Sequence, residues 1–182
     1  MRGIFIVGLP CAGKSIYGSI AESMGYAFAE WSSIVKKDLF DPITPRHEVH
    51  QSIGKLVAQK GVDYYPRKIL ETLTKCGATE HVVSGARNPH ELLKFRSFYD
   101  ASLVVWISST YLIRFRRSIT RNRCDADLSI KEFLASDFYE LNGGLAEIAA
   151  KQVDVILFND CDFSDFSQMV SAQILEFFTA VS

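Results

Sequence analysis

The sequence contains no run of 18 or more consecutive apolar residues, and no signal-peptide pattern precedes its first apolar segment. A helix that spans a membrane needs about 20 apolar residues, so we expect no membrane partner and a cytoplasmic location. Internal repeats, low-complexity tracts and linker-like stretches are also missing. The 182 residues are therefore expected to form one domain, 1–182, that is large enough to bury a core.

An excess of charge is absent as well, since 20 Lys and Arg stand against 21 Asp and Glu, a formal net charge of −1. No overall field then attracts the protein to nucleic acid or to a membrane surface, and affinity for polyanions must come from local clusters. Apolar residues make up 48% and charged residues 23%, which excludes a disordered chain. The sequence has four scattered cysteines, Cys11, Cys76, Cys124 and Cys161. They form no C-x-x-C pair, which favours reduced thiols over a disulfide or zinc framework.

What the sequence does contain is a phosphate-binding motif. Residues 8–15 read Gly-Leu-Pro-Cys-Ala-Gly-Lys-Ser and match G-x-x-x-x-G-K-[ST], between an apolar run at 4–7 and a helix-like stretch at 15–24. The backbone N–H groups of such a loop surround a polyphosphate, while Lys14 reaches the β- and γ-phosphates and Ser15 holds Mg²⁺. We therefore predict a nucleotide site whose ligands are Gly8, Cys11, Ala12, Gly13, Lys14 and Ser15.

Short apolar segments alternate with helix-like segments along the chain. Strands are predicted at 4–7, 26–29, 82–83, 103–107 and 153–158. Helices are predicted at 15–24, 33–40, 44–60, 65–75, 88–95, 110–119 and 129–140, and from 164 onward. This alternation predicts an α/β fold, in which helices cover both faces of a five-stranded parallel sheet.

Ligands of a parallel sheet bind beyond the carboxyl ends of its strands, so the residues that follow each strand are informative. The phosphate loop follows the first strand. Polar or charged groups follow the other four predicted strands, at residues 30–33, 84–88, 114–123 and 159–160. Their shared position predicts a single crevice at one edge of the sheet.

Five arginines lie within ten residues after the fourth strand: Arg114, Arg116, Arg117, Arg121 and Arg123. One interpretation of this cluster is a basic helix face that is exposed to solvent. For Arg116 that interpretation stays open. Phosphoryl transfer develops charge that guanidinium groups neutralise, so we predict a mobile lid at about 114–128 that closes over the phosphates. A switch GTPase would carry an N-K-x-D motif, which the stretch 154–160 does not supply. The cluster therefore favours a kinase.

Taken in order, these segments resemble small P-loop kinases of the nucleoside-monophosphate-kinase type. The sequence looks most like archaeal dephospho-coenzyme-A-kinase-like proteins, and next like phage deoxynucleoside monophosphate kinases. The likeness covers nearly the whole chain and runs through the phosphate loop, Thr44-Pro45-Arg46, residues 82–91, Arg114 to Arg123, Asp137 with Glu140, and residues 154–159. It implies a three-layer P-loop kinase fold with a small helical lid, acceptor-binding helices at 33–75, and ATP and Mg²⁺ as cofactors.

The resemblance also implies roles for individual residues. The acceptor pocket would be lined by Ser33, Lys36, Arg46, Gln51 and Arg87. The lid would bring Arg117, Arg121 and Arg123 to the phosphates, and Asn159 would lie near the adenine. The catalytic set would then be Lys14, Glu30, Arg87, Arg117 and Arg121.

The chain departs from the family pattern at Ser84, where an acidic residue usually precedes the glycine after the third strand. The acid after the second strand is likewise replaced, by Ser32 or Ser33. Such carboxylates hold the Mg²⁺ shell or orient the attacking hydroxyl. Either Glu30 or Asp38 substitutes for them, or transfer relies on positioning and charge neutralisation alone, or catalysis is impaired.

We therefore expect an ATP- and Mg²⁺-dependent phosphotransferase whose acceptor is a small nucleotide-like molecule, a (deoxy)nucleoside monophosphate or dephospho-coenzyme A. One alternative acceptor is a hydroxymethylated pyrimidine in DNA, although a net charge of −1 disfavours DNA as a partner. Another alternative is a nucleotide-binding regulator with little turnover, suggested by the missing carboxylates. The expected assembly is a monomer or a homodimer.

Overall fold

The structure, a computed structural model, describes residues 1–39, 55–75, 77–120 and 129–180, without the side chains of residues 36, 38 and 39. Within these residues no helix combines the length and the apolar character needed to cross a membrane.

A five-stranded sheet forms the centre of the molecule, with all described pairings parallel. Its strand order is β2-β3-β1-β4-β5. The strands are β1 (Arg2–Val7), β2 (Ala27–Glu30), β3 (Glu80–Ser84), β4 (Ala101–Ser108) and β5 (Val155–Phe158). The central strand β1 is apolar throughout residues 4–7 because neighbouring strands flank it and helices cover both of its faces.

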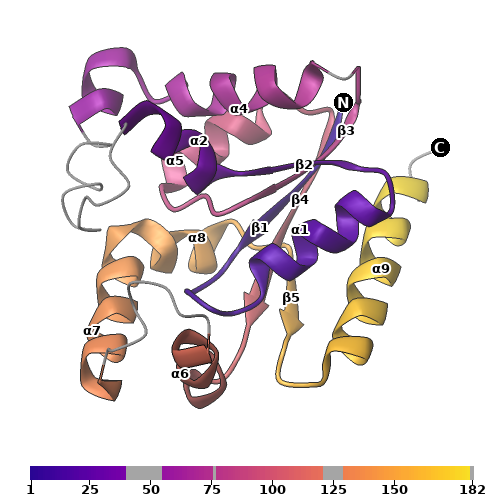
Figure 1. The fold of residues 1–182 in the computed structure, drawn as a ribbon. Coiled ribbons are helices and arrows are strands. Elements are labelled where there is room, and N and C mark those ends of the chain that lie inside the picture. The colour runs from indigo at the N-terminus through magenta and orange to yellow at the C-terminus, as the bar shows by residue number, and fades with distance from the viewer. Residues whose placement is uncertain (40–54, 76, 121–128, 181–182) are drawn as a thin grey trace.

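Two apolar cores cover the two faces of this sheet. The described helices are α1 (Lys14–Ser23), α2 (Trp31–Leu39), α4 (Tyr64–Thr74), α5 (Pro89–Arg96), α6 (Tyr111–Thr120), α7 (Ile130–Glu140), η1 (Leu141–Leu145), α8 (Ala146–Lys151) and α9 (Phe163–Thr179). Ile4 and Ile6 of β1 pack with α1 and α9, whereas Phe5 and Val7 pack with α2, α4, α5 and α8 (Figure 1). The predicted three-layer α/β fold is thus confirmed.

Two of the differences from the predicted element boundaries concern the start of α2 and the segment after α7. The helix predicted at 33–40 begins at Trp31, directly after β2. The helix predicted at 129–140 is followed by the short segment η1, and a kink at Gly144, whose backbone is not helical, separates it from α8, a helix that was not predicted. The φ angle of Gly144 is 124°, and a Cβ atom there would lie 2.4 Å from the carbonyl oxygen of Arg87. Close packing against the loop after β3 therefore requires this glycine.

The helix predicted at 44–60 is described only in part. Residues 55–60 are helical, and the remainder of that prediction lies outside the described residues.

Candidate functional site

The phosphate loop joins β1 to α1 and has the backbone of an anion-binding turn. Gly8 and Gly13 have φ angles of 142° and 116°, and Cys11, at 61°, also lies in the left-handed region. No side chain caps the start of α1, so an anion could satisfy the N–H groups at this helix end. A Cβ atom on Gly13 would lie 2.1 Å from the side-chain nitrogen of Asn159, so only glycine permits this approach.

Lys14 folds back over the loop. Its Nζ donates hydrogen bonds to the carbonyl oxygens of Gly8, at 2.7 Å, and Leu9, at 2.8 Å. Such bonds hold the ammonium against the main chain of the loop.

The charges around Lys14 come from three other segments of the chain. The pKa of Lys14 is lowered to about 8, first by burial and then by the positive charge of Arg87. Glu140, Cys11 and Glu30 raise it, in decreasing order. Arg87 and Glu30, both predicted site residues, therefore lie within electrostatic reach of the loop lysine.

Asn159 fixes the loop after β5 to the phosphate loop. The residue is 2% exposed, and its side-chain amide donates a 2.7 Å hydrogen bond to the carbonyl oxygen of Ala12. Its main-chain N–H donates to the carbonyl oxygen of Ser108 at the end of β4. Asn159 is thus an anchor of the loop, and its position near a nucleotide base stays a prediction.

The arginine cluster does not act as one unit. Arg117 donates from Nη2 to the main-chain oxygen of Asn159, at 3.0 Å, and to its Oδ1, at 3.2 Å. Its Nη1 lies 3.5 Å from the carbonyl oxygen of Cys11. Arg117 therefore borders the phosphate loop, whereas Arg116 is exposed, and the predicted contact of Arg117 with a polyphosphate stays a prediction.

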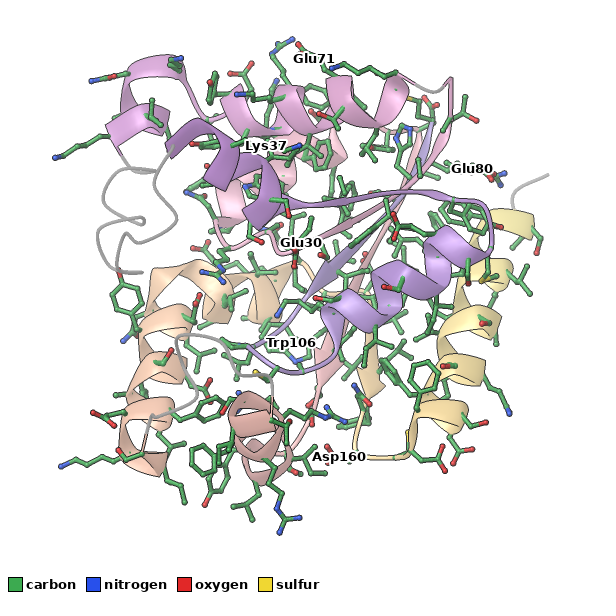
Figure 2. The ribbon with its side chains drawn as sticks, viewed as in Figure 1. Glu30, Lys37, Glu71, Glu80, Trp106 and Asp160 are labelled. Atoms are coloured by element: carbon green, nitrogen blue, oxygen red, sulfur yellow. The ribbon has the colours of Figure 1, made fainter. Side chains whose placement is uncertain are left out.

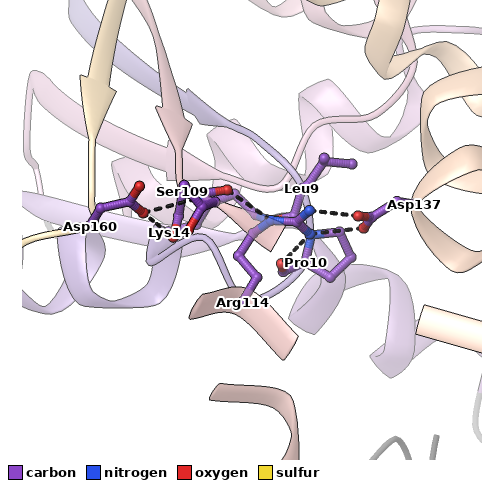
Figure 3. A network of polar contacts seen from close by, with 8 residues as sticks. Leu9, Pro10, Lys14, Ser109, Arg114, Asp137 and Asp160 are labelled. Atoms are coloured by element: carbon purple, nitrogen blue, oxygen red, sulfur yellow. Dashed lines mark hydrogen bonds and ion pairs between the residues drawn. The ribbon is translucent and has the colours of Figure 1, made fainter. Parts of the chain in front are cut away.

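Arg114, which the sequence groups with the lid, is instead buried beneath the loop (Figure 3). It forms a bidentate ion pair with Asp137 of α7, at 2.9 and 2.6 Å. It also donates to the carbonyl oxygens of Pro10, at 3.3 Å, and Ser109, at 3.1 Å. A cation held in this way is a structural brace and is not available to close over a substrate.

Arg87, in the loop after β3, is paired with an acid that the prediction did not place in the site. Its Nη1 lies 2.9 Å from Oε1 of Glu140, the last residue of α7. The Glu140 side chain is 2% exposed and that of Arg87 is 38% exposed. The spacing of Asp137 and Glu140, three residues apart on a helix, was the available signal, because both acids then share a face.

The acidic side of the site lies at the ends of β2 and β3. Glu30 and Ser84 are paired in register there, and Figure 2 shows the Glu30 side chain where β2 meets α2. Ser33 donates a 3.2 Å hydrogen bond to Oε2 of Glu30. The Oγ atom of Ser84 is buried and has no hydrogen-bond partner among the described residues. The missing carboxylate therefore leaves an unsatisfied hydroxyl beside Glu30.

Several predicted site residues fall outside this description. They are Arg46, Gln51, Arg121 and Arg123, together with the side chain of Lys36. Ser33 is described and exposed at the start of α2.

Sequence relatives of the chain include archaeal proteins. It is 28% identical over 174 residues to a UPF0200 protein of Methanoculleus marisnigri, covering 94% of each chain. It is 28% identical over 161 residues to a UPF0200 protein of Methanothermobacter thermautotrophicus, covering 86% of this chain and 80% of the relative. No family model matches the chain.

Similar solved structures include three kinases. A shikimate kinase from Bacteroides thetaiotaomicron has a TM-score of 0.60 at 17% identity, with 98% of each chain covered. A gluconokinase from Sinorhizobium meliloti has a TM-score of 0.58 at 17% identity, with 99% of this chain and 95% of the other covered. A dephospho-CoA kinase from Campylobacter jejuni has a TM-score of 0.56 at 18% identity, with 100% of each chain covered. The chain therefore has the fold of P-loop kinases and resembles archaeal UPF0200 proteins in sequence.

Proposed function

We propose that this protein is an ATP-dependent phosphotransferase whose acceptor is a small nucleotide-like molecule, such as a (deoxy)nucleoside monophosphate or dephospho-coenzyme A. The observation that carries the proposal is the gathering of cations around the phosphate loop. Lys14 lies across the loop, Arg117 borders it, and Arg87 lies within electrostatic reach from another strand end. Phosphoryl transfer requires this kind of convergence, because charge develops on the moving group.

The nucleotide would be held mainly by the loop. The backbone of Gly8 to Ser15 would surround the β-phosphate, and Lys14 would exchange its two carbonyl partners for phosphate oxygens. Arg117 would contact the polyphosphate, and Arg121 and Arg123 would join it from the lid. Asn159 would border the base.

The residues present fit Mg²⁺ held mainly by its substrate. Among the described residues there is no group of three His, Cys, Asp or Glu side chains that could bind a metal alone. A kinase site needs no such cage, because phosphate oxygens and water complete the coordination, with Ser15 as protein ligand and Glu30 as an outer partner. Bound there, the ion would supply positive charge that neutralises the charge developing on the transferred group.

In the transfer step, an acceptor oxygen attacks the γ-phosphorus as the bond to the β,γ-bridging oxygen breaks. The leaving electron pair remains on ADP. If the acceptor is a hydroxyl, its proton passes to Glu30, the described carboxylate at the end of β2. Arg87 and Arg117 stabilise the equatorial oxygens, and Ser33, Lys36, Arg46 and Gln51 would orient the acceptor.

A nucleotide-binding regulator with little turnover is the second candidate. The observation that favours it is Ser84, a buried serine at the position where the resemblance to nucleotide kinases implies an acid. A single-turnover assay with radiolabelled ATP separates the two candidates.

The experiment is a screen for ADP release with a panel of monophosphates, dephospho-coenzyme A and hydroxymethylated DNA, followed by the Lys14→Ala variant. Turnover should fall by several orders of magnitude in Lys14→Ala, because the cation on the transferred group is lost while the backbone cradle survives. Lys75→Ala, which removes an exposed lysine just after α4, should retain full activity. Phosphotransfer near the wild-type rate by Lys14→Ala would refute the kinase proposal.

A further inference from the structure

Two buried carboxylates on α7 each hold an arginine from a different part of the chain. Asp137 and Glu140 are 6% and 3% exposed and lie one helical turn apart. Asp137 binds Arg114 through both oxygens, and Glu140 binds Arg87 at 2.9 Å.

The two pairs differ in what their cations can reach. The Arg114 side chain is 4% exposed and its remaining bonds go to main-chain oxygens, Pro10 among them. The Arg87 side chain is 38% exposed, so part of it is accessible from solvent while its partner is buried. One pair therefore braces the phosphate loop, and the other presents a cation to the site.

The segment that follows Glu140 also holds the main chain of residue 87. Gly144 approaches so closely that a Cβ atom would lie 2.4 Å from the Arg87 carbonyl oxygen and 2.9 Å from Cδ of Pro89. Gln152 donates a 3.0 Å hydrogen bond from Nε2 to the carbonyl oxygen of Pro89. Both the backbone around Arg87 and its side chain are thus held by the segment that runs from the end of α7 to the end of α8.

One carboxylate oxygen of Glu140 can still accept a hydrogen bond. Its Oε2 atom is buried and has no hydrogen-bond partner among the described residues. A buried carboxylate oxygen without a donor lowers stability, so its presence calls for an explanation. A guanidinium can bind a carboxylate through two parallel N–H groups. Arg87 and Glu140 can therefore form a second hydrogen bond, to Oε2.

We propose that Glu140 is a positioning residue for Arg87: it aims the guanidinium at the phosphoryl group that passes between nucleotide and acceptor. This inference rests on the proposed function. Since the backbone cradle and Lys14 bind the nucleotide without Arg87, loss of Glu140 affects transfer much more than nucleotide affinity.

The test compares Glu140→Gln with Asp137→Asn. Glu140→Gln keeps the shape and removes the charge, and it should lower kcat by about tenfold to a hundredfold, the scale expected for a misplaced catalytic group. The Kd of a non-hydrolysable ATP analogue should change by less than about threefold in this variant. Asp137→Asn releases the Arg114 brace under the loop and should instead weaken binding of the analogue. A Glu140→Gln variant with normal kcat would overturn the inference.

A double-mutant cycle separates positioning from general structural support. If Glu140 acts through Arg87, then Arg87→Gln combined with Glu140→Gln should be no slower than Arg87→Gln alone. Losses that multiply would show that Glu140 acts independently of Arg87, and would refute the inference.

A spectroscopic measurement keeps the inference testable if the protein transfers no phosphoryl group. The Nη–H signal of Arg87, assigned by its disappearance in Arg87→Lys, should be observable in the wild type, where Nη1 is bound to Glu140, and lost through exchange in Glu140→Gln. An inactive wild type would refute the proposed function alone. Persistence of the signal in Glu140→Gln would refute the role of Glu140 in holding Arg87.

Discussion

Asn159 and Ala12 are joined by a 2.7 Å hydrogen bond between a buried side-chain amide and a main-chain carbonyl oxygen. This bond ties the end of β5 to the phosphate loop across 147 residues of sequence. The loop conformation therefore depends on a strand that is distant in the sequence.

The first prediction concerns that bond. Asn159→Ala leaves the Ala12 oxygen without its donor, so the free energy of unfolding should fall by about 1–3 kcal/mol and nucleotide affinity should fall several-fold. Denaturant unfolding and calorimetric titration measure the two effects. Asn142→Ala, at an exposed position, should change the unfolding free energy by less than about 0.5 kcal/mol. Equal stability of the two variants would contradict the anchoring role.

The second prediction concerns the missing acid. Glu30→Gln keeps the shape of the side chain and removes its charge, so the transfer rate should fall about 10²–10⁴-fold with little change in ATP binding. Ser84→Asp in the same background should recover part of the loss, because residues 30 and 84 are paired in register.

Steady-state kinetics and nucleotide titration measure these effects, with circular dichroism to confirm that Ser84→Asp folds. Glu22→Gln, at an exposed position on α1, serves as the control. Normal turnover in Glu30→Gln would leave Glu30 as a solvated strand end and direct attention to Asp38 or to transfer without a base.

The third prediction concerns the lid. If Arg117, Arg121 and Arg123 contact the polyphosphate, amide hydrogens of residues 116–128 should exchange more slowly once ATP and an acceptor analogue bind. Hydrogen exchange read by mass spectrometry measures this directly. Helix α9, which lies on the opposite side of the phosphate loop from α7, is an internal reference that should change little (Figure 1). Equal exchange with and without ligands would assign these arginines to a solvated helix face.

The fourth prediction concerns Glu91, a buried residue of α5 that is 4% exposed. Burial raises the pKa of its carboxyl group from 4.5 to about 7. The folded state then binds a proton that the unfolded state releases, so stability is lost as the pH rises from 4.5 through 7. Glu91→Gln removes this loss and should be more stable than the wild type at pH 8, by up to about 3 kcal/mol.

Denaturant unfolding at a series of pH values measures this difference. The gap between the two proteins should close below pH 4.5, where the glutamate is protonated in both states. A constant gap across the series would contradict the assignment of this titration to Glu91.

The sequence alone determined the phosphate loop, the five parallel strands and most of the helices. These features depend on local patterns: a motif of eight residues, continuous apolar runs and helical spacing. The helix α8, which follows the kink at Gly144, was not predicted because its six residues are too few to show a clear helical spacing. Here the glycine is required by its contact with Arg87, 57 residues earlier in the chain.

Only the tertiary structure decided which charged residues act together. In the sequence, Arg114 and Arg117 are neighbours in one cluster, yet Arg114 is bound to Asp137 beneath the loop and Arg117 lies against Asn159. Glu140 likewise acquires its place beside Arg87 and Lys14 from the packing of α7 against the loop after β3. The role of a charged side chain depends on the partner that it contacts in the folded protein. In these pairs the partner lies far away in the sequence, so local patterns do not identify it.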